Sequence, residues 1–77
     1  MMQTYDFSWA LHELRAARVV TRKGWNGKGM YLALQIPDSG SANTLPYIWI
    51  KTAQGGRVPW VASQTDLLAL DWEAVTA

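Results

Sequence analysis

A six-residue segment at 25–30, WNGKGM, combines glycines with an aromatic ring, an amide and a cation. The glycines let backbone N–H groups approach a ligand without interposed side chains. Trp25 can stack on a base, Asn26 can bind hydroxyl groups, and Lys28 can attract a phosphate. The same residues also fit a simple hairpin turn with a core tryptophan, because Asn-Gly is a strong reverse-turn signal. The spacing matches neither familiar phosphate-loop pattern, so nothing indicates a nucleoside triphosphatase.

A second segment, PWVASQTD at 59–66, places four polar residues before a short helix expected over 67–70. The free N–H groups at the start of a helix favour anions. Capping by Ser63 or Thr65 alone would explain one or two of these residues but not all four. Asp66 would repel a phosphate at close range, so we expect it to accept hydrogen bonds from ribose hydroxyls instead. The four residues of this candidate ligand segment are Ser63, Gln64, Thr65 and Asp66.

The residue types argue against catalysis and against a metal site. A nucleophile needs a base within hydrogen-bond reach, and His12, the only histidine, is expected alone on an exposed helical face. Asp71 and Glu73 lie on one side of an expected strand, but nothing in the sequence separates their pKa values. The carboxylates are too few and too scattered to indicate a metal. We therefore expect a non-enzymatic protein with no cofactor.

The length and composition indicate one small domain, residues 1–77, that assembles with copies of itself. A chain of 77 residues buries a smaller share of its surface than a larger domain, and without cysteine it has no disulfide to reinforce it. It nevertheless carries five tryptophans, whose large faces must be covered. We expect some of these faces in the core, and at least one at a subunit contact or a ligand site.

The charge distribution limits the classes of molecule that the protein is expected to bind. A net charge of +1 gives no field strong enough to hold a nucleic-acid polymer. Five of the seven cations nevertheless fall between residues 15 and 28, which indicates either a solvated basic surface or local attraction of a small anion. The sequence shows no signal peptide and no apolar run of membrane-spanning length. We therefore expect a soluble, intracellular protein.

The elements that must hold these segments indicate an α+β fold, with an N-terminal helix packed on a small antiparallel sheet. Apolar residues at helical spacing predict a helix over 7–17, with Asp6 as its N-cap. Pro59 cannot donate to a sheet, so its strand should be short or lie at an edge. A polar loop is expected over 37–46. The predicted strands cover residues 18–21, 30–36, 47–52, 57–61 and 71–75, with the short second helix before the last.

Three segments together resemble a family of small phage proteins, the Thoeris anti-defence sponges, formerly known only as a domain of unknown function. They are WNGKGM at 25–30, KTAQG at 51–55 and PWVASQTDLLALDWE at 59–73, and the resemblance extends from about Phe7 to Glu73. The loop at 37–46 looks shorter than the corresponding connection in many members. If that loop covers a pocket or a subunit contact, ligand preference or assembly will differ here.

The resemblance implies a function. Such proteins bind glycocyclic ADP-ribose, a signal made from NAD by bacterial TIR immune enzymes, and hold it without cleaving it. They form homotetramers with the ligand in clefts between subunits, in the cytoplasm of the infected host. Some also capture guanine-containing cyclic dinucleotides at separate sites, which would block CBASS signalling. The implied ligand contacts are Trp25, Asn26, Gly27, Ser63, Gln64, Thr65 and Asp66, with weaker support for Met30 and Arg22.

Three other functions remain open. The protein is alternatively a structural or interaction component of a phage, whose tryptophan faces meet other proteins. It is alternatively an enzyme that degrades the same signal, or a carbohydrate-binding module in which sugars stack on tryptophan.

Overall fold

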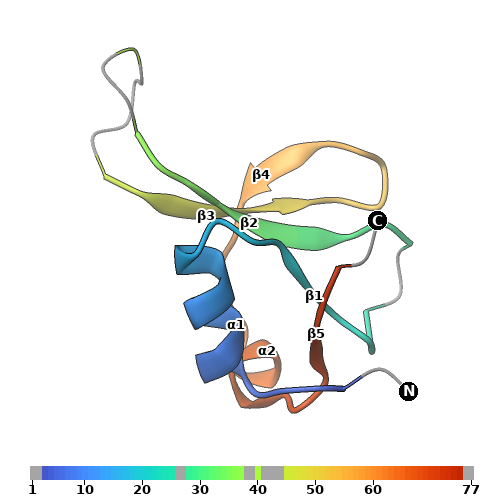
Figure 1. Ribbon diagram of the computed structural model, residues 1–77. Coiled ribbons are helices and arrows are strands. Elements are labelled where there is room, and N and C mark those ends of the chain that lie inside the picture. Colours follow the sequence, from blue (N-terminus) through green and yellow to red (C-terminus); the bar gives the residue numbers. More distant parts are fainter. Residues whose placement is uncertain (1–2, 26–27, 38–39, 41–44, 76–77) are drawn as a thin grey trace.

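The computed structural model describes residues 3–25, 28–37, 40 and 45–75, and it confirms the predicted α+β class (Figure 1). One five-stranded antiparallel sheet and two helices make up this part of the chain. In chain order the elements are α1 (Phe7–Arg15), β1 (Val20–Arg22), β2 (Tyr31–Gln35), β3 (Tyr47–Lys51), β4 (Arg57–Pro59), α2 (Gln64–Leu68) and β5 (Trp72–Ala74).

The strands lie in the order β4-β3-β2-β1-β5, so the last strand of the chain pairs with the first. In that pairing Arg22 of β1 lies opposite Trp72 of β5. β4 is a three-residue strand at the edge of the sheet, as the prediction from Pro59 required. On the far side of β5, Tyr5 exchanges backbone hydrogen bonds of 2.8 and 3.0 Å with Trp72. The topology therefore brings both ends of the chain to one end of the sheet.

Helix α1 begins as predicted, because the Asp6 side chain accepts the N–H of Trp9 at 3.0 Å. It ends at Arg15, two residues earlier than predicted. Ala17 has a φ of 65°, in the left-handed region, and two hydrogen bonds close the end of the helix there. They run from Ala17 N–H to the Leu14 carbonyl and from Arg18 N–H to the Glu13 carbonyl, both at 3.0 Å. Apolar spacing alone did not reveal this helix end, because glycine is the usual signal for it.

The predicted bounds of the strands and of the second helix are also corrected. The first strand covers Val20–Arg22 instead of 18–21, because the backbone N–H of residue 18 is used to close α1. Helix α2 starts at Gln64, since Ser63 already caps it, and residue 69 is extended (φ −69°, ψ 149°), so the helix stops at Leu68. The other predicted strands are each shorter than expected by one or two residues, as their bounds above show. Most of the predicted loop at 37–46 lies outside the described residues.

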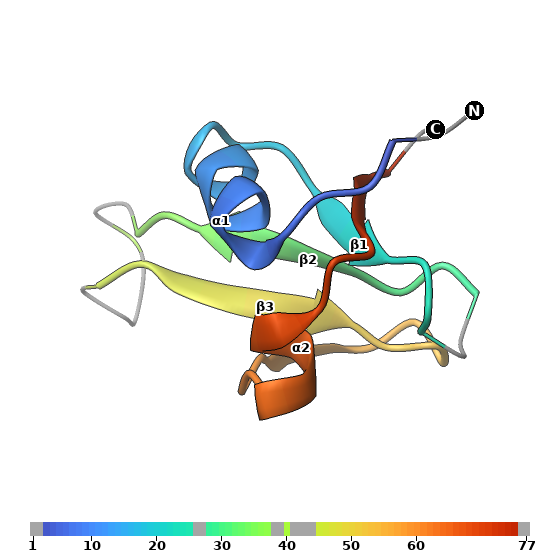
Figure 2. The ribbon, with the colours of Figure 1, turned by 90° about the horizontal axis from the view of Figure 1, so that it is seen from below.

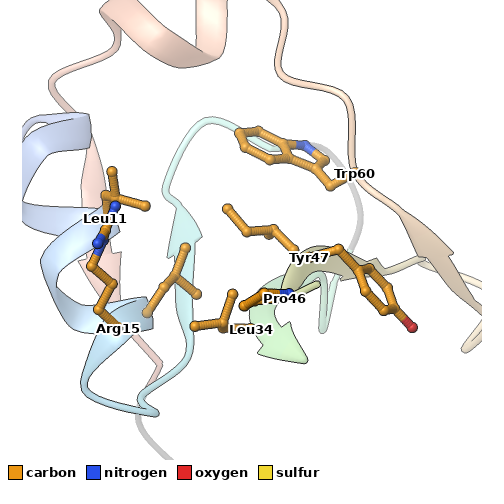
Figure 3. Close-up of a pocket in the computed structure, with 8 residues that line it drawn as sticks. Leu11, Arg15, Leu34, Pro46, Tyr47 and Trp60 are labelled. Atoms are coloured by element: carbon orange, nitrogen blue, oxygen red, sulfur yellow. The ribbon is translucent and has the colours of Figure 1, made fainter. Parts of the chain in front are cut away.

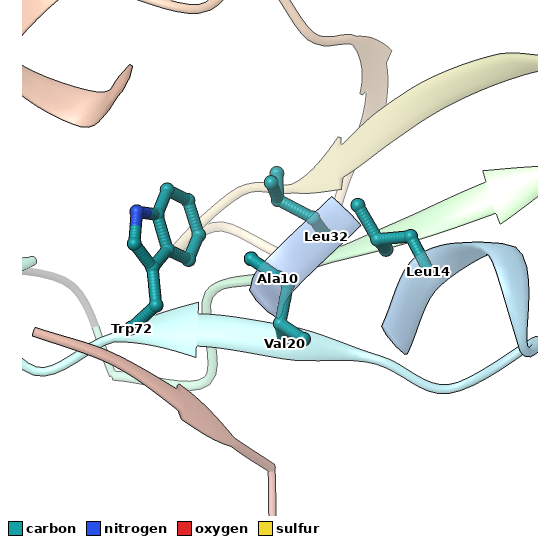
Figure 4. Packing of buried hydrophobic residues seen from close by; sticks show 5 residues of the cluster. All are labelled: Ala10, Leu14, Val20, Leu32 and Trp72. Atoms are coloured by element: carbon teal, nitrogen blue, oxygen red, sulfur yellow. The ribbon is translucent and has the colours of Figure 1, made fainter. Parts of the chain in front are cut away.

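The core lies between α1 and the sheet, and Figure 2 shows both helices on the same side of the sheet. Helix α1 contributes Ala10 and Leu14, which are fully buried. They pack with three fully buried residues of the sheet, Val20, Leu32 and Trp72 (Figure 4). Burying a large aliphatic side chain stabilises a fold by about 1.5–3 kcal/mol. These five fully buried residues make a small core. Neither of the two described helices is long and apolar enough to span a membrane.

Four aromatic rings, one of them the core residue Trp72, pack together beside α2. Trp72 is the centre, and its indole N–H donates to the Asp66 backbone carbonyl at 3.0 Å. The rings of Phe7, Trp25 and Trp60 lie 5.3, 5.4 and 6.2 Å from the ring of Trp72, all at steep angles. Edge-to-face packing of this kind stabilises aromatic pairs by about 0.5–1.5 kcal/mol beyond area burial. This aromatic cluster (Phe7, Trp25, Trp60 and Trp72) forms one wall of the candidate site.

Candidate functional site

An arginine held between two carboxylates forms the centre of the candidate site. Arg22, at the end of β1, donates from Nη1 to Asp66 Oδ1 and from Nε to Asp71 Oδ1, both at 2.8 Å. The side chains of Arg22 and Asp66 are 15% and 14% exposed, so both charges are largely removed from water. Ion pairs with little exposure and several hydrogen bonds are held more rigidly than surface pairs. The Arg22–Asp66–Asp71 triad therefore fixes β1, α2 and the start of β5 together.

Trp25 joins this triad through its side chain. Its indole N–H donates to Asp66 Oδ1 at 3.2 Å, and its ring packs against Trp72 at an interplanar angle of 78°. Trp25 is half-buried, so part of its surface remains accessible. The ring is fixed at its edge by a hydrogen bond and at one side by another ring. Such a ring is a preorganised surface on which a planar group can stack.

The segment that begins at Trp25 is anchored at both ends. At its start, the backbone N–H of Gly24 donates to Asp71 Oδ2 at 2.8 Å, and the N–H of Trp25 donates to the Arg22 carbonyl at 3.2 Å. At its end, the Thr21 hydroxyl donates to the Met30 carbonyl at 2.7 Å. The predicted ligand segment is therefore tied down on β1 from both sides.

The triad perturbs the pKa values of its members. The hydrogen bond to Asp71 raises the pKa of Arg22, partly opposed by burial, and the bond to Asp66 raises it further. Burial raises the pKa of Asp66, but hydrogen bonds from Arg22, Ser63 and Trp25 outweigh it, so the pKa lies below its ordinary value. The hydrogen bond from Arg22 lowers the pKa of Asp71 despite some burial, and the Gly24 N–H lowers it further. Both carboxyls are therefore ionised acceptors at neutral pH.

Two of the four predicted polar residues, Ser63 and Asp66, cap the N-terminus of helix α2. Asp66 N–H donates to Ser63 Oγ at 3.0 Å, and Ser63 N–H donates to Asp66 Oδ2 at 3.4 Å, which makes a capping box. Gln64 and Thr65 lie in the first turn and are exposed, instead of preceding the helix as expected. Because Asp66 places a carboxylate over that turn, the start of α2 is a poorer place for an anion than the sequence indicated.

The structure brings together several of the predicted site residues. Arg22, Trp25 and Asp66 are in direct contact, and Ser63 contacts Asp66. Met30 is half-buried at the other end of its segment, while Gln64 and Thr65 are exposed beside the triad on α2. Asn26 and Gly27 lie outside the described residues. Asp66 already accepts three hydrogen bonds, so its first role is to hold Arg22 and Trp25 rather than to meet a ribose.

Sequence reasoning missed two residues of this site. From the sequence, Asp71 was named only as an acid/base candidate and Gly24 was not named, but they contact each other and hold the start of the 25–30 segment. Nothing local in the sequence indicates this, because Arg22 and Asp71 are 49 positions apart. The pairing of β1 with β5 brings them together.

Charges of both signs lie at and near the site. Lys23 and Lys28 are exposed close to the triad in sequence, and the triad itself holds one positive and two negative charges. His12 is exposed on α1, as predicted. In the parts of the chain that the structure describes, no three His, Cys, Asp or Glu side chains gather in a way that would hold a metal ion.

A separate hollow of about 440 Å³ lies between α1 and the β2–β3 hairpin (Figure 3). Its walls are mostly aliphatic and aromatic, with Arg15 at its rim. It shares Trp60 with the aromatic cluster but includes none of the predicted ligand residues. The residues that line it are Leu11, Leu14, Arg15, Leu34, Pro46, Tyr47, Ile48 and Trp60.

Comparison with known proteins agrees with the motifs. A family model described as the Thoeris anti-defense 2-like domain matches residues 5–75. The Thoeris anti-defense 2 protein of Bacillus phage SP01 is 38% identical over 89 aligned residues, which cover 99% of this chain and 100% of that protein. All the contacts of the triad and of Trp25 fall within the matched region. The chain therefore belongs to the Thoeris anti-defense 2-like family of phage proteins, which confirms the resemblance seen in its motifs.

Proposed function

We propose that this protein counters Thoeris immunity by binding glycocyclic ADP-ribose and holding it without cleavage, in the cytoplasm of the infected bacterium. The observation that carries the proposal is the family match over residues 5–75, which includes both candidate ligand segments. The name of the relative from Bacillus phage SP01 states an anti-Thoeris role for that protein. The ligand and the mode of action for this chain are our proposal.

The geometry supports a site built for binding. Trp25 is half-buried and fixed by Asp66 and Trp72, so it can stack on a base without first being ordered. Gln64 and Thr65 are exposed beside it on α2 and can donate to or accept from ribose hydroxyls. The exposed cations Lys23 and Lys28 suit the phosphates. These groups match the three parts of an ADP-ribose derivative.

The lowered pKa values and the ion pairs of the two carboxylates support binding of the ligand without cleavage. A general acid or base works best with a pKa near the working pH. Asp66 and Asp71 have pKa values below the ordinary range and are occupied by Arg22. We therefore propose that the protein is not an enzyme. The enzyme alternative predicts that substoichiometric protein consumes the ligand.

We further propose that the working form is a homo-oligomer, a tetramer in keeping with the family resemblance. Nanomolar affinity corresponds to about −12 kcal/mol, which demands that most of the ligand be buried. The triad site lies at the surface of a small monomer. On and beside α2, Val61, Leu68 and Leu70 are 88%, 76% and 73% exposed. Exposed aliphatic side chains that gather on one surface mark contact sites, and we infer that these three, close together in the chain, form such a patch. A second subunit on this patch would enclose the site next to it.

A second ligand class follows from the same family resemblance. We propose that guanine-containing cyclic dinucleotides also bind, at a different place on the oligomer, and that this blunts CBASS signalling. Competition titrations with glycocyclic ADP-ribose separate the two: ligands at different sites bind together, and ligands at one site exclude each other.

Paired substitutions test the ligand assignment. Trp25→Ala should abolish glycocyclic ADP-ribose binding in a folded protein, while Trp9→Ala, which removes a ring stacked on Tyr5 at 4.2 Å, should leave affinity unchanged. Gln64→Ala should weaken binding several-fold, and Gln54→Ala, which changes another exposed glutamine, in the β3–β4 turn, should not. If the two variants of each pair bind the ligand with the same affinity, the ligand site does not lie on α2 and the 25–30 segment.

A further inference from the structure

Asp71 holds three consecutive residues of the chain with one side chain and one carbonyl. Its Oδ1 accepts from Arg22 Nε at 2.8 Å, and its Oδ2 accepts from the Gly24 backbone N–H at 2.8 Å. Its own backbone carbonyl accepts the N–H of Lys23 at 3.0 Å. Together these contacts fix the path of the chain as it leaves β1 toward Trp25.

Gly24 suits this contact because of space, not because of backbone conformation. A Cβ built at Gly24 would lie 2.8 Å from Asp71 Oδ2, closer than real Cβ atoms come. Its φ is not positive, unlike that of Gly29 and Gly55. A side chain at position 24 would therefore force a shift at the Asp71 carboxylate, which accepts the N–H of Gly24. Gly24 therefore offers a second, independent way to disturb Asp71.

The contacts continue from Asp71 to the ligand-binding ring. With Asp71 on its Nε, the Arg22 guanidinium presents Nη1 to Asp66 Oδ1 at 2.8 Å. The same oxygen accepts the indole N–H of Trp25 at 3.2 Å. Bidentate contacts orient a guanidinium far better than a single charge does. We propose that Asp71 is a positioning residue, which sets the orientation of Trp25 through Arg22, Asp66 and Gly24.

The consequence for ligand rests on the proposed function, but the positioning itself does not. If Asp71 sets the Trp25 ring, its loss leaves the chain folded around Trp72 and releases the indole N–H from Asp66. Affinity then falls because the ring must be ordered when the ligand binds. A purely structural Asp71 would change the free energy of unfolding and leave the ring where it is.

The test uses the full chain with Asp71→Asn, Gly24→Ala and the double variant. Gly56→Ala is the matched control, because Gly56 also donates its N–H to a side chain, Thr52 Oγ1 at 3.1 Å, but has room for a Cβ. In ligand-free protein, the ¹H–¹⁵N signal of the Trp25 indole should move toward that of a free indole in both test variants and stay in place in Gly56→Ala. An unmoved Trp25 indole signal in folded Asp71→Asn and Gly24→Ala would overturn the inference.

Titration with glycocyclic ADP-ribose then measures the consequence. At a temperature where all variants are folded, each single change should weaken binding about tenfold, which is about 1.4 kcal/mol. The double variant should lose no more than Asp71→Asn, because both changes break the same contact. The positioning role would be contradicted if the affinity losses of the two single variants multiplied in the double variant. Unchanged affinity despite a moved indole signal would also contradict it. If the unmodified protein takes up no ligand, the proposed function fails, and the indole signal still decides whether Asp71 positions Trp25.

Discussion

The indole N–H of Trp25 donates to the carboxylate of Asp66 at 3.2 Å, across 41 positions of the sequence. The two residues belong to different motifs, and neither motif alone indicates that they meet. Arg22 donates to the same oxygen at 2.8 Å, so one carboxylate atom holds both a charge and a ring. If the proposed ligand binds here, these contacts hold Trp25 in place before it arrives, which lowers the cost of binding.

The triad gives stability a definite dependence on pH. Asp66 and Asp71 have folded-state pKa values below their ordinary value of 3.8, so their ionisation favours folding. This contribution is complete above the ordinary pKa and is lost as the pH falls through the folded values. Asp71→Asn should therefore lower the free energy of unfolding more at about pH 6 than at about pH 2.5, as urea denaturation at each pH measures. A constant difference between the two proteins across this range would show that Asp71 is not held by its charge.

The end of α1 carries removable strain. Ala17 has a φ of 65°, where an L-residue with a Cβ is disfavoured and glycine is not. Ala17→Gly should raise the free energy of unfolding by about 1 kcal/mol, measured by denaturant titration. Ala16→Gly is the matched control, since Ala16 has a φ of −88° and gains nothing from a glycine. If both variants lose stability alike, the left-handed conformation at residue 17 is wrong.

The exposed patch on α2 should mediate self-association. Leu68→Asp places a charge on a side chain that is 76% exposed, so it should leave the monomer folded and reduce the mass seen by light scattering. Leu45→Asp is matched in exposure, at 74%, but lies at the start of the segment leading into β3. Loss of assembly in Leu45→Asp with an intact oligomer in Leu68→Asp would place the subunit contact elsewhere.

Local patterns predicted the elements well where side-chain spacing decides them. The alternation in β2 and β3 places Leu32 and Ile50 toward the helices and Trp49 on the opposite face, as the period of two indicates. The cap at Asp6 and the edge position of Pro59 were also predicted correctly. The end of α1 was not, because a left-handed alanine leaves no mark in the sequence.

Several residues of the candidate site were expected from the sequence, but the contacts between them were not. Chemistry and family resemblance indicated Trp25 and Asp66, and they do lie together. The role of Asp71 depends on the pairing of β1 with β5, which sets Arg22 opposite Trp72. Forty-nine residues separate those strands, and no local signal specifies which strand closes a sheet. The contacts that hold the site could therefore be identified only from the structure.

The most direct test of the central proposal is a calorimetric titration of glycocyclic ADP-ribose into the unmodified protein. The ligand is then released by heat and its mass is measured. We expect tight binding, in the nanomolar range near −12 kcal/mol, with the ligand recovered intact at its original mass. No heat of binding would contradict glycocyclic ADP-ribose as the ligand, and a changed mass would contradict capture without cleavage.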